Sequence, residues 1–201
     1  MKALVSPNIF HGAVEAAFPG KRTRKLWRID RIGKHCYLML ISVEKPMFEQ
    51  AVKQFGFLDR KEKWETKEYH TLLERVQNNT VWHFRLVANP TISVSNGRGK
   101  RGCVHAHVTS FYQKKWLLER CEKNGFWIDD NQLAVIENKW QKFYKGSERK
   151  NMVNLLAVTY EGILQVTDAE KFRRTLLEGM GRGKAFGMGM LTIAKAGDDI
   201  R

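Results

Sequence analysis

The chain has 201 residues, and its 35 Lys and Arg against 21 Asp and Glu give a formal net charge of +14. No apolar run reaches the ~18 residues of a membrane-spanning helix, we see no secretory signal, and three scattered cysteines exclude a disulfide framework, so we expect a reduced, cytoplasmic protein. A charge this positive exceeds what solubility requires and favours a polyanionic partner, because phosphate contacts release counterions.

The first half of the chain predicts a helix, two strands and a second helix. In chain order these elements are residues 2–18, 25–30, 36–43 and 46–55. Pro19-Gly20 ends the first helix, Pro46 opens the second, and Gly56 closes it. Residues 58–79 are polar and charged, and they predict an irregular link with one short strand at most.

The second half predicts further strands and helices. Strands are expected at residues 82–88, 103–109, 153–166 and 190–194, and helices at residues 112–124 and 168–178. Asn96-Gly97 marks a turn between the first two of these strands. The order of elements fits an α+β protein with two tandem ferredoxin-like (RRM-like) domains, over residues 1–76 and 77–201.

A glycine-rich segment lies near the end of the chain. Gly179-Met-Gly-Arg-Gly-Lys-Ala-Phe-Gly-Met-Gly189 has five glycines in eleven residues, and their backbone amides can approach an anion beside Arg182 and Lys184. The segment runs from a helix, which starts at the capping-box spacing Thr167-Asp-Ala-Glu170, to a strand. A Rossmann loop runs from strand to helix, and a P-loop needs Ser or Thr where Ala185 stands. A loop that lies along a polyanion backbone is the better interpretation.

Basic residues also gather in two other parts of the chain. Residues 75–118 contain no Asp or Glu, and residues 21–25 hold four cations. A solvated basic face would explain any single cation, but the joint pattern favours a nucleic acid. The candidates for contact with it are Lys21, Arg22, Arg24, Lys25, Arg85, Arg98, Lys100, Arg101, Arg182 and Lys184.

His11 is the main candidate for chemistry. On the first helix Phe10 and Val14 belong to an apolar stripe, whereas Asn8 and His11 lie on the opposite, polar side. A histidine gives and takes protons near neutral pH, which RNA strand scission by 2′-hydroxyl attack requires at both oxygens. The spacing alone leaves open that His11 is a surface histidine with no role.

Other groups of titratable residues are weaker candidates. Cys103, His105 and His107 alternate along a strand and could seat a soft metal, but no fourth ligand lies nearby, which favours a polar strand face that touches RNA. The pairs Asp129-Asp130 and Asp198-Asp199 occur in loop or tail composition and are poor candidates for a two-metal nuclease site. We expect no metal and no other cofactor.

Several short motifs together carry a resemblance to a known family. They are His11 followed by Phe18-Pro19, then Lys25-Leu-Trp-Arg28, Phe84-Arg-Leu-Val-Ala-Asn-Pro90, Gly99-Lys-Arg101, Tyr160-Glu-Gly162 and Gly183-Lys-Ala-Phe-Gly-Met-Gly-Met-Leu191. Each motif is weak alone, but they recur in family order over nearly the whole chain. The chain closely resembles the CasE family, the CRISPR repeat-processing endoribonuclease of type I-E systems.

The resemblance implies tandem ferredoxin-like domains that hold a CRISPR repeat stem-loop on a basic surface. It also implies metal-independent cleavage at the 3′ base of the stem, which leaves a cyclic phosphate and a 5′-hydroxyl. The enzyme would then stay with its product as a subunit of the Cascade surveillance complex in antiviral defence. We expect a monomer when the protein is alone. His11 stands at the position of the family's catalytic histidine.

Asn8 departs from the family pattern, which has a tyrosine three residues before the histidine. Asn cannot supply a phenolic proton, although it can hydrogen-bond a phosphate or a hydroxyl, and a cation of residues 21–25 could substitute electrostatically. Two hypotheses therefore stand. The protein is an RNase that acts through His11, or an RNA-binding scaffold subunit that holds the repeat hairpin with little or no cleavage.

The start of the chain carries a separate expectation. A ferredoxin-like domain begins with a central strand, and family members have roughly 15–20 residues before the point where this chain starts, at Met1. Without that strand, neighbouring backbone groups lose partners that each contribute about 1 kcal/mol or more. We expect that the natural protein starts upstream, and that the first sheet lacks a strand beside residues 36–43.

Overall fold

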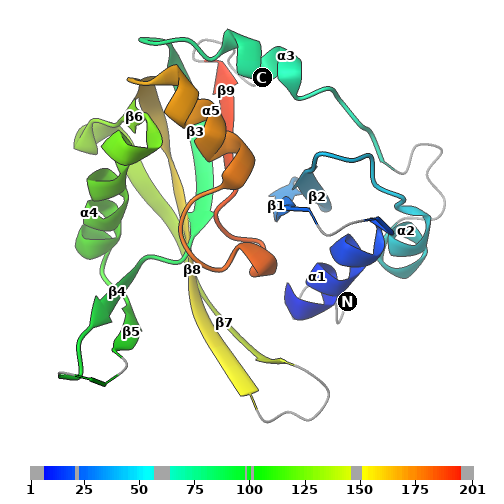
Figure 1. Cartoon of the computed structure of the whole chain (residues 1–201), viewed down its shortest axis with the longest axis horizontal. Coiled ribbons are helices and arrows are strands. Elements are labelled where there is room, and N and C mark those ends of the chain that lie inside the picture. Colours follow the sequence, from blue (N-terminus) through cyan, green and yellow to red (C-terminus); the bar gives the residue numbers. More distant parts are fainter. Residues whose placement is uncertain are drawn as a thin grey trace.

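The protein is an α+β molecule, as the sequence predicts, and its sheets are antiparallel. In this computed structural model the described residues are 7–20, 23–56, 64–97, 99–100, 102–145 and 151–195. Figure 1 shows a larger sheet with helices in the second half of the chain, and a smaller helix–strand unit beside it in the first half. Among the described residues, no helix is long and apolar enough to cross a membrane.

The second half has ferredoxin-like topology. Its elements are β3 (Val81–Ala88), α4 (Ser110–Cys121), β6 (Phe126–Trp127), β7 (Leu133–Lys145), β8 (Asn151–Val166), α5 (Ala169–Glu178) and β9 (Leu191–Lys195), with 3-10 turns η2 (Glu122–Asn124), η3 (Asp130–Gln132) and η4 (Lys184–Phe186). The strands lie in the order β6-β8-β3-β9, and β7 also pairs with β8. Because β6 and β7 both pair with β8, they act as one interrupted edge strand, which gives the expected βαββαβ order.

The core of this half lies between the sheet and its two helices. Residues of β3 alternate between exposed or half-buried and buried positions, as a strand with one face on a core must. The buried side chains include Trp82, Phe84 and Leu86 of β3, Trp116 and Leu117 of α4, Tyr160 and Leu164 of β8, and Phe172 and Leu176 of α5. Helix α5 is capped by Asp168, whose carboxylate accepts from the Lys171 backbone N–H at 3.0 Å, rather than by Thr167 as expected.

Two hairpins extend from this sheet. The first is β4 (Thr91–Val94) with β5 (Cys103–Ala106), which is shorter than the predicted strand at 103–109 because the chain then enters α4. The second is the ribbon of β7 and β8, which runs on beyond the sheet (Figure 1), since pairing continues to Lys145↔Asn151 while β3 pairs with β8 only over residues 158–165. The sequence analysis missed β4 and β7, because exposed ribbons need no apolar alternation.

The first half follows the predicted order. It contains α1 (Pro7–Ala16), β1 (Leu26–Ile32), β2 (His35–Ile41) and α2 (Glu49–Phe55). Phe10, Val14 and Trp27 belong to its small core. In the described part of the chain, β1 and β2 form a sheet of their own. Where the natural protein begins stays a prediction.

The link between the halves differs from the prediction. It contains helix α3 (His70–Arg75), where the sequence predicts an irregular segment with one strand at most. The core of the second half is contacted by Tyr69, Leu72 and Leu73. Tertiary contacts therefore stabilise this helix, although its largely polar sequence does not predict one. The division into domains at residues 76 and 77 stays a prediction.

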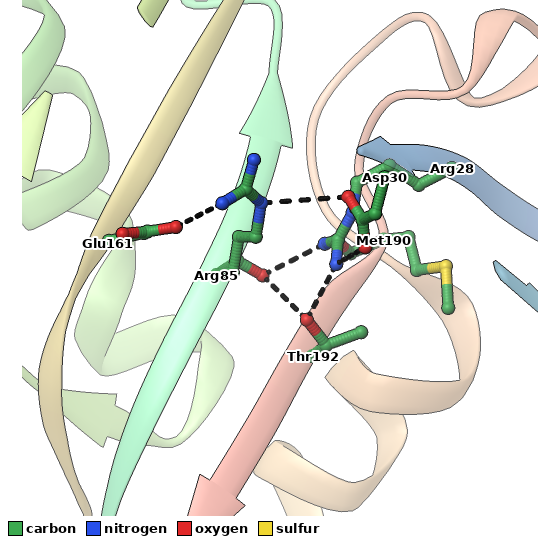
Figure 2. Close-up of polar contacts among 6 residues, drawn as sticks. All are labelled: Arg28, Asp30, Arg85, Glu161, Met190 and Thr192. Atoms are coloured by element: carbon green, nitrogen blue, oxygen red, sulfur yellow. Dashed lines mark hydrogen bonds and ion pairs between the residues drawn. The ribbon is translucent and has the colours of Figure 1, made fainter. Parts of the chain in front are cut away.

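Arg28 of β1 joins the two halves through a buried guanidinium. Figure 2 shows its contacts with Asp30 and with the facing strands β3 and β9. Nε and Nη2 donate to the Asp30 carboxylate at 2.7 Å each, and Nη1 donates to the carbonyls of Arg85 and Met190 at 3.2 Å each. Nη2 also donates to Thr192 Oγ1 at 2.9 Å. All five guanidinium donors are used, so β1 is fixed against the end of the glycine-rich segment.

Candidate active site and nucleic-acid interface

His11 lies where α1 meets the glycine-rich segment. Its ring and that of Phe186 in η4 meet in an edge-to-face arrangement, with a centroid separation of 6.4 Å and an interplanar angle of 65°. Phe186 in turn contacts Phe143 of β7 at 4.8 Å. His11 is half-buried, while Phe10 and Val14 of the same helix are buried in the first core, so the predicted division of α1 into polar and apolar faces is confirmed.

The glycine-rich segment folds tightly against its neighbours. Gly187 has φ +78°, and a Cβ there would lie 2.9 Å from the Trp27 ring. Gly189 has φ +83°, a Cβ there would lie 2.5 Å from the Met180 carbonyl oxygen, and its N–H donates to the Val87 carbonyl at 2.6 Å. These two glycines are therefore required by backbone conformation and close approach. Such packing holds Phe186, and with it His11, in place.

Several cations lie on or near the glycine-rich segment. Arg24 is exposed, and its Nη1 donates to the Glu178 carbonyl at 3.4 Å where α5 ends. Arg182 is exposed, and Lys184 is half-buried in η4. Burial of the ammonium and the nearby Arg24 lower the pKa of Lys184, and Glu178 opposes them. The structure thus brings Arg24 close to Lys184, which lies two residues before the Phe186 that His11 contacts, although Arg24 and Lys184 are far apart in the sequence.

The lowered pKa of Lys184 leads to a pH-dependent prediction. Lys184 loses its proton at a lower pH than an ordinary lysine, so its contribution to RNA affinity should be lost first as the pH rises. An arginine stays charged. We expect the affinity of Lys184→Arg for hairpin RNA, relative to the original protein, to increase between about pH 7 and about pH 10. Binding titrations at constant ionic strength measure this ratio, and a ratio that does not change with pH would contradict the prediction.

Asn8 lies on α1, one turn before His11, and is half-buried. An amide at this position can donate a hydrogen bond to a phosphate oxygen and accept one from a hydroxyl, but it cannot exchange a proton. Its role in the reaction stays a prediction.

Two of the predicted RNA contacts bind acidic side chains within the protein. The Lys25 side chain is 2% exposed, and its ammonium lies 3.3 Å from Glu15 Oε2 and 4.8 Å from the Phe18 ring centroid. The structure does not support Lys25 as an RNA contact, because a buried, paired ammonium cannot reach a phosphate. Arg85 is 37% exposed and pairs with Glu161 and, at 3.6 Å, with Asp30 (Figure 2). A role of Arg85 in RNA binding stays a prediction.

One further predicted contact lies in an exposed turn. Lys100 is exposed between β4 and β5, at the tip of that hairpin. The described residues do not include Lys21, Arg22, Arg98 and Arg101, so their contacts stay predictions.

The alternative metal site receives no support from geometry. Cys103 and His105 are exposed on β5, and His107 stacks on Tyr112 with ring centroids 5.8 Å apart. Within the part of the chain that the structure describes, no three His, Cys, Asp or Glu side chains are placed to hold one ion. Asp129 instead caps η3 by accepting from the Asn131 N–H.

Sequence reasoning missed two features of this surface. In the sequence Phe186 is marked only by its place in a family motif, yet its ring packs against that of His11. The ribbon of β7 and β8 exposes Lys139 and Lys142, two cations outside the predicted set of RNA contacts, because the sequence predicts no strand there. A run of lysines spaced among aromatic residues was the available signal.

Comparisons with known proteins agree with the motifs. A model of the family described as "CRISPR associated protein" matches residues 1–195. The CRISPR-associated endoribonuclease Cse3 of Thermus thermophilus is 30% identical over 193 residues, which covers 90% of this chain and 85% of that protein.

Solved structures share the fold. CRISPR endoribonuclease Cse3 bound to a 19 nt RNA matches with a TM-score of 0.73 and 26% identity, over 96% of this chain and 90% of that one. A chain of a CRISPR RNA-guided surveillance complex matches with a TM-score of 0.66 and 18% identity, over 95% and 91% of the two chains. The family that the sequence motifs predict is thereby confirmed. The chain belongs to the CRISPR-associated protein family and is a protein of the CasE type.

Proposed function

We propose that this protein is an endoribonuclease that binds the repeat stem-loop of precursor CRISPR RNA and cleaves it without a metal. The main observation in support of the proposal is the position of His11. Its ring lies against Phe186 of the glycine-rich segment, and that segment also contains Lys184. His11 belongs to the first half of the chain and the glycine-rich segment belongs to the second half, so the site needs both halves. The relatives are named as CRISPR endoribonucleases, one of them bound to RNA.

The chemistry is a transfer within the RNA. The 2′-hydroxyl oxygen forms a bond to the adjacent phosphorus, and the bond from phosphorus to the 5′ oxygen of the next nucleotide breaks. One proton leaves the 2′-hydroxyl and one reaches the leaving 5′ oxygen, which gives a 2′,3′-cyclic phosphate and a 5′-hydroxyl. His11 is the group that moves a proton, and Lys184 and Arg24 stabilise the negative charge that grows on the phosphate.

A single experiment separates this function from the scaffold hypothesis. Labelled repeat RNA is incubated with the protein in the presence of EDTA and then run on a denaturing gel. We expect one cut at the 3′ base of the stem. Retained binding without a cut would favour a scaffold subunit, for which the replacement of the family tyrosine by Asn8 is the motivating observation.

We also propose that the protein keeps its product and serves as a subunit of an RNA-guided surveillance complex. The net charge of +14 supports this, because tight retention of RNA requires many phosphate contacts. One structural relative is a chain of such a complex.

The cations predict how RNA binding responds to salt. Each phosphate contact that is removed should flatten the salt dependence of affinity by about 0.7–0.9 in log–log slope. The residues to replace with alanine, singly and together, are Arg98, Lys100, Arg101, Arg182 and Lys184. Binding titrations over a range of salt concentrations measure the slopes. A multiple variant with an unchanged slope would mean that these residues face away from the RNA.

A further inference from the structure

A cleft lies among the β4–β5 hairpin, the β7–β8 ribbon and the start of the glycine-rich segment. It has a volume of about 490 Å³, within the range of ~300–1,000 Å³ that small-ligand sites occupy. Its lining includes His105 of β5, Trp140 of β7, Asn154 of β8 and Arg182. Trp140 and Phe143 have opposite parity along β7, so the cleft and the Phe143–Phe186–His11 contacts lie on opposite faces of the ribbon. The cleft is therefore distinct from the site described above.

The floor of the cleft has an unused hydrogen-bond acceptor. Asn89 is 4% exposed, lines the cleft, and its backbone bridges to Arg182. Among the described residues, its side-chain oxygen Oδ1 has no hydrogen-bond partner. A buried amide oxygen without a hydrogen-bond partner lowers the stability of the folded protein. A ligand that donates a hydrogen bond to it therefore binds more tightly. For a ligand in the cleft to reach this oxygen, the amide must rotate about its last side-chain torsion, which is soft in Asn.

The walls of the cleft fit an unpaired nucleotide. The Trp140 side chain is 47% exposed, which leaves a ring surface on which a base can stack. Arg182 is an exposed cation for the phosphate, and the lining contains no Asp or Glu. Lys142, two residues from Trp140 and therefore on the same face of β7, is also exposed and adds to the attraction for a phosphate. The exposed Trp140 ring favours a nucleotide base over an acidic peptide.

We propose that this cleft binds one single-stranded nucleotide of RNA, with its base stacked on Trp140 and its exocyclic amino group donating to Asn89. The phosphate of that nucleotide contacts Arg182. The proposal rests on the proposed function in taking RNA as the ligand, and it adds a site for RNA outside the base-paired stem. An acceptor in the lining pairs with the exocyclic amino group of adenine, cytosine or guanine, whereas uracil has no amino group and offers only its ring N3–H, so we expect a preference for adenosine over uridine.

The test uses hexaribonucleotides of adenosine and of uridine, which contain no stem-loop. Fluorescence anisotropy of the labelled oligonucleotides gives their affinities for the whole protein. We expect Trp140→Ala to weaken binding of the adenosine oligonucleotide by roughly ten-fold or more, and Trp140→Phe to retain most of the affinity. Trp127→Ala is the matched control, because Trp127 is equally exposed, at 53%, on the edge strand β6. Asn89→Leu should remove the preference for adenosine over uridine.

Several results would overturn the proposal. The first is that Trp140→Ala and Trp127→Ala bind the adenosine oligonucleotide with equal affinity. The second is that Trp140→Ala and Trp140→Phe lose the same amount of affinity for it. The third is that Asn89→Leu keeps its preference for adenosine over uridine. Unchanged oligonucleotide binding with lost assembly into the surveillance complex would assign the cleft to a protein partner instead. Because the probes lack a stem-loop, failure of the protein to cleave repeat RNA would not produce any of these results.

Discussion

Replacement of His11 by alanine should slow cleavage of repeat RNA by about 10²–10⁴-fold, the usual contribution of proton transfer by a positioned side chain. Affinity for the stem-loop should stay within a few-fold, because phosphate contacts from the many cations dominate binding and one imidazole adds little. Single-turnover cleavage with excess protein measures the chemical step, and filter binding of RNA with a 2′-deoxy residue at the cleavage position measures affinity.

The control for His11→Ala in the cleavage assay is His70→Ala. His70 is an exposed histidine of α3 that pairs with Glu74 at 3.5 Å, away from the glycine-rich segment. This variant should cleave at the rate of the original protein. If His11→Ala also cleaved at that rate, the assignment of His11 would be wrong.

Replacement of Arg28 by alanine should lower the free energy of unfolding by about 3–5 kcal/mol, the usual cost of removing one partner of a buried ion pair. The Arg28 side chain is 4% exposed and that of Asp30 is 14% exposed, so the change removes both short hydrogen bonds of a largely buried carboxylate, which keeps only the 3.6 Å contact with Arg85. The carbonyls of Arg85 and Met190 each lose one donor as well. Cleavage should fall as well, since β1 would no longer be fixed against Met190, where the segment that holds Phe186 ends. Urea unfolding measures the stability.

Arg28→Lys and Arg31→Ala complete this test. Lysine should not restore stability, because a single ammonium cannot reproduce the planar fork that reaches Asp30, both carbonyls and Thr192. Arg31 is an exposed cation on the same strand, and its replacement should change stability by less than about 0.5 kcal/mol. Equal stabilities of Arg28→Ala and Arg31→Ala would show that the buried contacts do not hold the two halves together.

The sequence predicted those elements whose local signals agree with their tertiary environment. The strand at Val81–Ala88 alternates because one face covers a core, and α1 has an apolar stripe because Phe10 and Val14 pack against Trp27. Helix α3 and strand β7 were missed for the opposite reason. The largely polar segment α3 is helical because a few apolar side chains pack against a core that is distant in the sequence. Strand β7 is held in a ribbon by its pairing with β8.

The site shows the same division. His11 could be predicted from its side of the helix and from the family motifs, but its contact with Phe186 joins residues that only the fold brings together. Composition marked Lys25 as a phosphate contact, whereas its proximity to Glu15 and Phe18 depends on how β1 follows α1. A count of cations cannot tell a buried, paired lysine from a free one.

The most direct test of metal-free cleavage through the 2′-hydroxyl is an analysis of the product ends formed in EDTA. We expect a 2′,3′-cyclic phosphate on the upstream fragment and a 5′-hydroxyl on the downstream fragment, because the 2′ oxygen displaces the 5′ oxygen. We also expect no cut in RNA with a 2′-deoxy residue at that position. A 3′-hydroxyl with a 5′-phosphate, or cleavage that stops in EDTA and returns with Mg²⁺, would contradict this mechanism.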